Sequence, residues 1–431
     1  MTFFRSPTRV HLNVDVRSGR PARAFAWIVF VLILIVTSRG LIELAIGKQT
    51  AYVVQAAAAF LLVGCLRRRA TIVPGTRRWG SYVAVYALVF SGLVSTFFTI
   101  NRWSLASATT PLLYVATMIA LGLLLCWGSD ADRRSDAIQI ILPSVVAVIS
   151  LQVAAAIAQQ YMGWGLLSGT DYGTFGDQAR PSGLTGSYLH YPLVLAVMGI
   201  VVFGAWRRRG SAILLCATGL AVFGILASYS RSGMMILAFT IVIAVSTGRT
   251  MATKVASVLA LVVAWTFISL AFSENPVLVR ALSALDLSSA GNSGRVRQWT
   301  DAMGSWFDSP LLFGSYTGLV TNISRNFGGS FSLGVVESSL LQQLLNLGIV
   351  GTVATYWLLG AVVRAVPVRD IWVRAGVSAC ILQTLIYQSI EVLPYVALLA
   401  IVPLVFTHAS SPTPAHTLKS LGPRSTWPVG A

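Results

Sequence analysis

Charged residues are scarce in this chain, and their scarcity excludes an ordinary soluble protein. Asp, Glu, Lys and Arg make up only 10% of its 431 residues, whereas hydrophobic residues make up 55%. A soluble domain carries about a quarter charged residues. Hydrophobic runs of ~17–25 residues recur along the chain, and each is long enough to cross a membrane as a helix. Because a spanning helix satisfies its own backbone, we predict an all-α polytopic integral membrane protein.

Cysteine and histidine are also few, with four residues of each. Cys65, Cys126, Cys216 and Cys380 fall inside or at the end of hydrophobic runs, which is typical of small packing residues. None of them has the spacing of metal ligands. The histidines are scattered and form no H-x-x-x-H pair. We therefore expect no metal site and no cofactor.

The hydrophobic runs predict about 12 transmembrane helices. The first run is too long, and its flanks are too polar, for a cleaved signal peptide. The expected spans are 24–46, 50–66, 80–100, 107–127, 137–159, 187–206, 211–229, 232–248, 252–273, 338–363, 371–390 and 393–408.

Basic residues give the predicted orientation. With the N-terminus in the cytoplasm, 22 of the 31 Lys and Arg residues lie on the cytoplasmic side, among them those of "LRRRA" (66–70) and "WRRRG" (206–210). This distribution follows the positive-inside rule and requires an even number of spans. The net charge of +17 therefore reflects orientation rather than nucleic-acid binding, and both termini are expected in the cytoplasm.

Two external connections are long, at about 160–187 and 274–337, and a loop of roughly 60 residues is often functional. The expected organisation has a large external loop set between two groups of helices. Its parts are a cytoplasmic tail (1–23), spans one to nine (24–273), the large loop (274–337), spans ten to twelve (338–408) and a second cytoplasmic tail (409–431).

Arginines on the external side are the first candidate site residues. Arg180 lies in "QARPSGLTGS", Arg231 in "SYSRSGMM", and Arg295 and Arg297 in "GNSGRVRQW". Positive charge is disfavoured on this side, and an interfacial Arg persists where it pairs with an anion, whose phosphate oxygens suit its planar donors. The alternative is a solvated loop charge, which fits Arg297 better than Arg180 or Arg231.

A carboxylate follows the large loop in "VVESSLLQQLLNLGIVG" (335–351). Glu337 and Ser338 begin an apolar helix there. In one interpretation the carboxylate stabilises the helix N-terminus. In the other it is a general base, which nearby arginines keep ionised. Glu391, in "YQSIEVLPY", is a lesser candidate on the same side.

Several of these segments resemble the Wzy-type O-antigen polymerase and O-antigen ligase superfamily of bacterial envelope glycosyltransferases. The family's Ser-Arg-small signature is similar to "SYSRSGMMIL", and its R-x-S-G segment to "ARPSGLTGSYLHYP". Its Arg-x-x-x-Trp helix, with a following Pro and Gly-rich turn, is similar to "GRVRQWTDAMGSWFDSPLLFGSYTG". The likeness covers about 160–351, in the family's order, and implies a GT-C-like fold with the large loop in the periplasm.

The sequence departs from the ligases at one position. Ligases of this superfamily place a His where Glu337 stands, with Asn or Ser next, and the large loop of this chain contains no His. The acidic variant is more usual among polysaccharide polymerases. The resemblance therefore favours a polymerase, and the histidine role proposed for ligases does not carry over.

The resemblance implies a bacterial inner-membrane enzyme whose donor and acceptor are oligosaccharide units on undecaprenyl pyrophosphate. Arg180, Arg231 and Arg295, with Arg297 as a weaker fourth, would bind the pyrophosphate, and cations aimed at developing charge lower the barrier. Glu337 and Arg231 would be catalytic, without a metal and with inversion. Weaker candidates for substrate contacts are Trp299, Tyr316 and Ser338, although an aromatic belt explains Trp and Tyr equally well.

Partners implied by the resemblance are a chain-length regulator and a flippase, and the product is a lipopolysaccharide, capsule or exopolysaccharide chain. The first alternative function is an O-antigen ligase that transfers the glycan to a lipid A-core acceptor. A transporter of lipid-linked glycans or anions also suits 12 spans, but inverted repeats are not evident. A structural scaffold would not need an arginine-lined external loop.

Overall fold

The computed structural model describes residues 20–69, 71–72, 79–103, 108–129, 133–134, 137–163, 173–175, 178–247, 255, 275–283, 290–327 and 333–406. Helices dominate this part of the chain. They are α1 (Arg20–Thr37), α2 (Arg39–Ile46), α3 (Lys48–Arg69), α4 (Trp79–Trp103), α5 (Thr109–Ser129), α6 (Ala137–Tyr161), α7 (His190–Arg209), α8 (Ala212–Ala227), α9 (Arg231–Ser246), α11 (Pro276–Leu282), α12 (Ala290–Phe307), α13 (Asn322–Phe327), α14 (Ser339–Ala365), α15 (Ile371–Thr384) and α16 (Leu393–Phe406).

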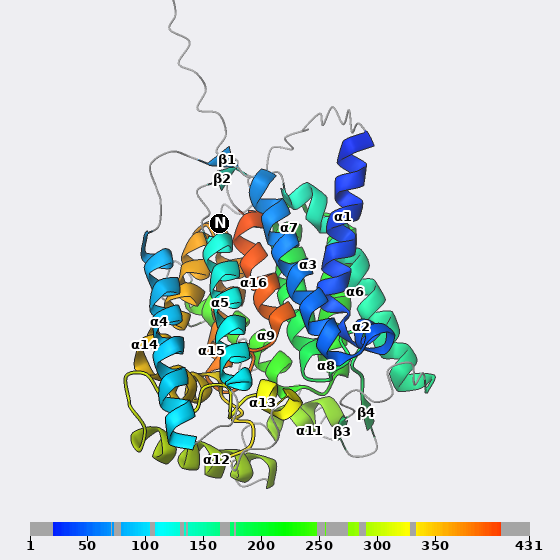
Figure 1. The fold of residues 1–431 in the computed structure, drawn as a ribbon. Coiled ribbons are helices and arrows are strands. Elements are labelled where there is room, and N and C mark those ends of the chain that lie inside the picture. Colours follow the sequence, from blue (N-terminus) through cyan, green and yellow to red (C-terminus); the bar gives the residue numbers. More distant parts are fainter. Residues whose placement is uncertain are drawn as a thin grey trace, which may run out of the picture.

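The long helices run side by side as one bundle, and α12 lies across the end of it at which α11 and α13 also lie (Figure 1). Within the bundle α14 packs on α4 and α5, α7 packs on α8, and α15 packs on α9 and α7. The core is filled by aliphatic side chains and by three fully buried tyrosines, Tyr114, Tyr191 and Tyr395. Close packing of this kind replaces the hydrophobic effect as the force between helices in lipid.

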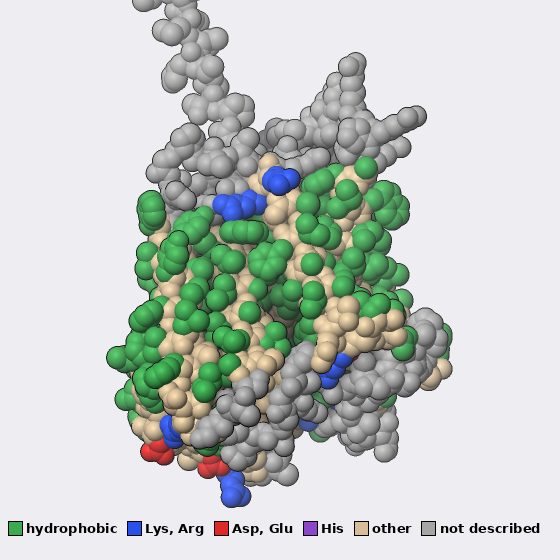
Figure 2. All heavy atoms as spheres, viewed as in Figure 1, with side chains coloured by type: hydrophobic (Ala, Val, Ile, Leu, Met, Phe, Trp, Pro, Cys, Tyr) green, Lys and Arg blue, Asp and Glu red, His purple; other side chains and the backbone are tan. Residues whose placement is uncertain are grey.

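The prediction of a helical multi-pass membrane protein is confirmed. Within the described residues, six helices are long and apolar enough to cross a membrane, namely α3, α4, α5, α6, α7 and α14, and a bent pair of helices raises the number to seven. Hydrophobic side chains cover the middle of the face seen in Figure 2, and charged side chains lie toward its two ends. This distribution matches a bilayer with a polar layer on each side.

The predicted number of 12 spans is not confirmed. The first expected span, 24–46, is two helices that meet at 79° near Ser38. Three further apolar helices, α8, α9 and α16, have only 14 to 16 residues. The ninth expected span, 252–273, lies outside the described residues except for residue 255, as do residues 1–19 and the C-terminal tail.

Two short antiparallel strand pairs were not predicted. At one end of the bundle β1 (Thr71–Ile72) pairs with β2 (Arg133–Arg134), and at the other end β3 (Gly173–Phe175) pairs with β4 (Gln178–Arg180). Strands of two or three residues carry too little alternation to be recognised from a sequence. The second pair matters for function because its last residue is Arg180.

A break in α14 locks the large loop onto the bundle. Gly348 has φ 62° and ψ −166°, which is outside the helical region. The backbone N–H groups of Ile349 and Val350 donate to the carbonyls of Leu311 and Leu312, at 3.0 and 3.1 Å. The loop therefore supplies the partners that the broken helix lacks, as a buried backbone requires.

Replacement of Gly348 tests this lock. A Cβ added at Gly348 would lie 2.3 Å from the carbonyl carbon of Leu312, and the left-handed φ disfavours any L side chain. We expect Gly348→Ala to lower the free energy of unfolding by about 2–5 kcal/mol, measured by thermal unfolding in detergent. Gly64→Ala is the control, because an added Cβ there meets nothing within 4 Å. Equal melting temperatures for the two variants would contradict the lock.

Candidate anion-binding site

One sharp turn positions three arginines. The turn joins α8 to α9, and Tyr229 within it has φ 49°, which makes it the one non-glycine residue with positive φ in the described chain. The Ser228 carbonyl accepts a hydrogen bond from Arg180 Nε, and the Tyr229 carbonyl accepts one from Arg280 Nε, both at 3.3 Å. Arg231 is the first residue of α9. Strained backbone of this kind is concentrated at functional sites.

Arg180 approaches the turn from the end of β4. Its side chain is buried, with 7% of the residue exposed, and its guanidinium lies 4.1 Å from the centre of the Tyr188 ring. Burial, together with the charges of Arg280 and Arg231 and against an opposing effect of Tyr188, lowers the pKa of Arg180 to about 10. The side chain still carries its charge at neutral pH, because this value is well above 7.

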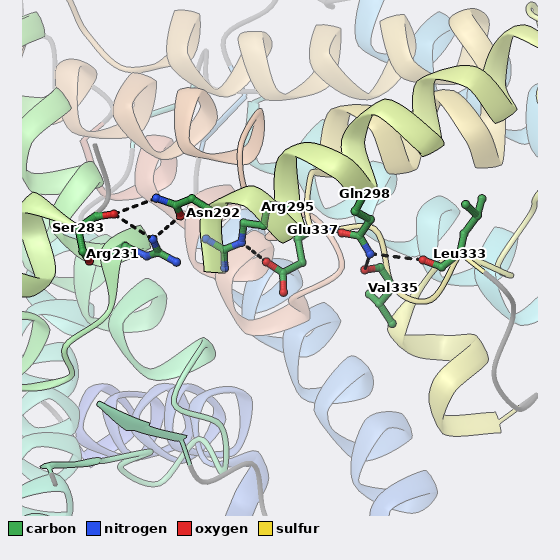
Figure 3. A network of polar contacts seen from close by, with 8 residues as sticks. All are labelled: Arg231, Ser283, Asn292, Arg295, Gln298, Leu333, Val335 and Glu337. Carbon is green, nitrogen blue, oxygen red and sulfur yellow. Dashed lines mark hydrogen bonds and ion pairs between the residues drawn. The ribbon is translucent and has the colours of Figure 1, made fainter. Parts of the chain in front are cut away.

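Arg231 connects α9 to the two helices of the large loop (Figure 3). Its Nη1 donates to Asn292 Oδ1 at 2.5 Å and to the Ser283 carbonyl at 3.4 Å. Asn292 Nδ2 donates to the same Ser283 carbonyl at 2.8 Å. Asn292 lies in the first turn of α12, so this network fixes the start of that helix beside Arg231.

Arg295 follows Asn292 by three residues and lies on the same side of α12. It forms an ion pair with Glu337, and its guanidinium lies 5.0 Å from the centre of the Tyr387 ring. Burial lowers the pKa of Arg295, but Glu337 and Tyr387 raise it by more, so the net shift is upward. Figure 3 shows the Arg295 side chain between Arg231 and the Glu337 carboxylate.

The position of Glu337 is fixed by hydrogen bonds between the Gln298 side chain and the backbone around Glu337. Gln298 on α12 accepts a hydrogen bond from the Glu337 N–H at 3.3 Å and donates to the Val335 carbonyl at 2.8 Å. The Glu337 side chain is 41% exposed. Its carboxylate therefore touches Arg295 on one side and is open to solvent on the other, as an acceptor of a proton from a bound molecule must be.

The four arginines form one cluster, which we call the arginine cluster: Arg180, Arg231, Arg280 and Arg295. Their charges act on one another. Burial lowers the pKa of Arg280, and Arg231 and Arg295 lower it further, while Arg231 lies within electrostatic reach of Arg295 and Glu337. Four cations and the carboxylate of Glu337 leave an excess of three positive charges. Preorganised guanidinium groups of this kind bind phosphate oxygens strongly.

Arg280 is the member that sequence reasoning missed. It is one of the nine Lys and Arg residues, out of 31, that are predicted to lie on the external side. This predicted location was the only indication in the sequence that Arg280 belongs to the site. It lies in "NPVLVRALSA", a stretch without a recognisable motif. Its place in the cluster depends on α11, a helix of seven residues, and on the carbonyl of the strained Tyr229.

Arg297 does not join the arginine cluster. Two residues of an α-helix are separated by about 200° around its axis, so Arg297 points away from the side that carries Arg295. It is exposed on α12. The interpretation of Arg297 as a solvated charge agrees with this placement better than its interpretation as a pyrophosphate ligand.

The aromatic candidates lie in a second hydrophobic core under α12. Tyr316 is only 3% exposed and packs there with Val320 and Leu345, while Trp299 packs against the same core. Arg102 lies 5.3 Å from the centre of the Tyr316 ring. The structure therefore places Trp299 and Tyr316 where they support α12, and Tyr316 has almost no surface with which to touch a sugar.

Ser338 is the N-cap of α14. Its hydroxyl accepts a hydrogen bond from Leu341 N–H at 3.3 Å and donates to the Leu385 carbonyl at 2.7 Å, and the residue is 1% exposed. This geometry corrects the expectation of a substrate contact, because both functions of the hydroxyl are used inside the protein. It also shows that Ser338, rather than Glu337, caps the helix.

Glu391 lies apart from the arginine cluster, in the turn between α15 and α16. Its Oε2 accepts a hydrogen bond from the Asn322 N–H at 3.1 Å. Burial raises the pKa of this carboxyl to about 7, against the opposing effect of hydrogen bonds from Asn322 and Gln342. A carboxyl with this pKa is largely uncharged below neutral pH.

No family model matches the chain, and a search of curated proteins gives no match. In the part of the chain described by the structure, no group of three or more His, Cys, Asp and Glu residues is placed to hold a metal ion. The arginine cluster beside Glu337 is therefore the feature from which a function is inferred.

The strained turn gives a test of how the cluster is held. A β-branched residue at φ 49° is strongly disfavoured, whereas Asn tolerates it. We expect Tyr229→Val to weaken the affinity for inorganic pyrophosphate about tenfold or more relative to Tyr229→Asn, because about 1–3 kcal/mol of strain is relieved only by moving the carbonyls that hold Arg180 and Arg280. Both variants lose the ring, so microscale thermophoresis of the pair isolates the backbone. Equal affinities would show that the turn does not position the cluster.

Glu391 predicts a dependence of stability on pH. Its carboxyl has a pKa of about 7 in the folded protein and an ordinary value of 4.5. A raised pKa stabilises the protonated fold, so this stabilisation is complete below about 4.5 and is lost as the pH rises to 7. We expect Glu391→Gln to flatten the fall in melting temperature between pH 5 and pH 8. The exposed Asp301 provides the control Asp301→Asn, and the same fall in all three proteins would exclude Glu391 as its cause.

Proposed function

We propose that this protein is a bacterial inner-membrane glycosyltransferase, a polymerase that joins oligosaccharide repeat units carried on undecaprenyl pyrophosphate. The observation that carries the proposal is the arginine cluster: four arginines lie within electrostatic reach of one another at one end of an apolar helical bundle, and one of them pairs with the open carboxylate of Glu337. The proposal also takes up the resemblance of "SYSRSGMMIL" and the neighbouring segments to the Wzy-type superfamily.

The charge of the cluster suits a lipid-linked pyrophosphate. The excess of positive charge matches the negative charge of two linked phosphates, and each arginine is already oriented by a carbonyl, an amide or a carboxylate. Because charge on the pyrophosphate grows as the glycosidic bond breaks, cations fixed beforehand stabilise the transition state more than the ground state. The arginines supply this stabilisation without a metal ion.

The place of the cluster suits a substrate held in the bilayer. The cluster lies where α8 meets α9 and where α7 begins, at the polar end of helices whose middle parts are apolar. A polyprenyl chain in the hydrocarbon would bring its pyrophosphate to this level, and the glycan would extend away from the membrane under α12. We place this end of the bundle in the periplasm.

Glu337 is the proposed general base. A hydroxyl oxygen of the acceptor sugar attacks the anomeric carbon of the donor and transfers its proton to the Glu337 carboxylate. The bond between the anomeric carbon and the phosphate oxygen breaks, and undecaprenyl pyrophosphate leaves with the bonding electrons into the arginine cluster. Attack opposite to the leaving group inverts the anomeric configuration. Arg295 pairs with Glu337 and would hold its carboxylate close to the leaving pyrophosphate.

The alternative in the same enzyme class is a ligase, which would use the same pyrophosphate cradle and differ in its acceptor. A transporter of lipid-linked glycans would need charged groups along a path through the bundle, whereas β4, α11 and α12, which carry three of the four arginines, lie at one end of it (Figure 1). The glutamate at position 337 and the lack of histidine in 274–337 favour the polymerase.

Purified protein in liposomes with its undecaprenyl-pyrophosphate-linked repeat unit tests this proposal. We expect a ladder of products on a gel, with the rate lowered about 10²- to 10³-fold in Arg231→Ala and in Glu337→Gln, as for removal of a group that stabilises developing charge. Lys48→Ala is the control, because it removes an exposed cation from the same end of the bundle.

The outcomes separate the alternatives. Single transfer that occurs only after an acceptor such as lipid A-core is added would make the protein a ligase. A ladder that persists at the wild-type rate in both variants would keep the polymerase and remove the arginine cluster and Glu337 as its site. No product with either acceptor from a well-folded protein would overturn the proposed activity.

A further inference from the structure

A second cationic site lies at the opposite end of the bundle. It is a cavity of about 340 Å³ between the end of α7 and the start of α15, lined by Gly204, Arg207, Arg208, Arg369, Asp370, Ile371, Trp372 and Val373. The arginine cluster adjoins the first turn of α7, so the two sites are separated by the length of this helix. A helix of 20 residues is about 30 Å long, which is the thickness of the hydrocarbon layer.

Two of the lining residues, Arg208 and Asp370, form an ion pair. Arg208 donates to both carboxylate oxygens of Asp370, through Nε at 2.8 Å and through Nη2, and Nη2 also donates to the Phe406 carbonyl at 3.0 Å. The Arg208 guanidinium lies 4.7 Å from the centre of the Phe406 ring. The pair therefore fastens α7 to α15 and α16, and the charge of Asp370 is largely used within it.

Two further arginines leave the cavity with excess positive charge. Arg369 Nε lies 3.7 Å from Asp370 Oδ2, and the Arg369 side chain is 51% exposed. Arg207 is exposed on the last turn of α7 and lines the same cavity. Three arginines and one carboxylate thus line the cavity, which leaves an excess of two positive charges there. Such a hollow attracts an oxygen-rich anion.

The rest of the lining is that of a membrane interface. Trp372 borders the cavity, and its ring lies 5.7 Å from that of Phe203, which in turn lies 5.5 Å from that of Trp206. Tryptophans are enriched at the level of lipid headgroups. Ile371 and Val373 continue the lining toward the apolar part of the bundle. An occupant with both an anionic head and an apolar body fits this arrangement better than a free ion does.

From this geometry we propose that the cavity binds the headgroup of an anionic phospholipid. The phosphodiester lies between Arg207 and Arg369, the glycerol and first methylenes lie against Trp372 and Ile371, and the acyl chains run along the bundle. The volume of about 340 Å³ equals that of roughly ten liquid water molecules, which is enough for a phosphate and its glycerol. Basic pockets between transmembrane helices bind anionic lipids in this way.

The proposal is independent of the glycosyltransferase activity, and binding is measured directly. Native mass spectrometry of the purified full-length protein is used to titrate phosphatidylglycerol against phosphatidylcholine. We expect phosphatidylglycerol to bind preferentially, and the double variant Arg207→Ala/Arg369→Ala to weaken its binding roughly 10- to 30-fold, the loss expected for two arginines at a membrane surface. Arg207→Lys/Arg369→Lys should keep most of the binding, because it keeps the charge.

Arg68→Ala is the matched control, because Arg68 is an exposed cation at the same end of the bundle and does not line the cavity. The double alanine variant leaves the Arg208–Asp370 pair intact, and its melting temperature without added lipid reports whether it is folded. Equal loss in Arg68→Ala, or no loss in the folded double variant, would overturn the site. Displacement of the lipid by millimolar inorganic phosphate would show a site for free anions and would also overturn the proposal.

Discussion

Mutual repulsion among four buried or half-buried guanidinium groups is the constraint on which one whole end of this protein depends. Like charges held close together in a poorly solvated place destabilise the fold unless each has a partner. The fold supplies two carbonyls from a single strained turn, one asparagine side chain, two aromatic rings and one carboxylate. These partners orient the arginines, and only the carboxylate removes one of the four positive charges. The cluster is therefore already arranged for a polyanion, and a polyanion would relieve the repulsion that the fold tolerates.

The break in α14 also determines where the Glu337 carboxylate lies. Glu337 is placed by α12, and α12 rests on a small core that includes Tyr316. Tyr316 in turn follows the segment whose backbone is bonded to α14 at the break around Gly348. A continuous helix would offer no free N–H groups to the carbonyls of Leu311 and Leu312. The large loop would then lose these hydrogen bonds to the bundle. Glycine at 348 is thus connected, through backbone hydrogen bonds and packing, to the position of an acid that it does not touch.

The sequence predicted the features that depend on composition, such as the hydrophobic helices. It did not predict the features that tertiary contacts determine. Hydrophobic runs revealed the helices, but the bend after Ser38 and the short helices α8, α9 and α16 follow from packing, which the runs do not encode. The sequence named three of the four arginines that the structure brings together, Arg180, Arg231 and Arg295. Arg280 was missed because a carbonyl 51 residues away orients it. Ser338 was taken for a substrate contact because its hydroxyl donates to the Leu385 carbonyl, 47 residues away in the chain, and the sequence does not show this contact.

Charge at both ends of α7 gives the protein a fixed depth in the bilayer. The helix begins beside Tyr188, which stacks on Arg180, and ends at the basic residues that line the second cavity, about 30 Å away by helical rise. Moving either cationic end of α7 into the hydrocarbon layer is energetically costly. Each end must therefore lie at the level of the lipid headgroups on its own side of the membrane. The proposed reaction on a lipid-linked pyrophosphate would depend on this depth, because the arginines would have to meet phosphates whose height the bilayer sets. Binding of an anionic lipid at the far end would oppose tilting of α7. It would thereby keep the arginine cluster at the height of the phosphates of the proposed substrate.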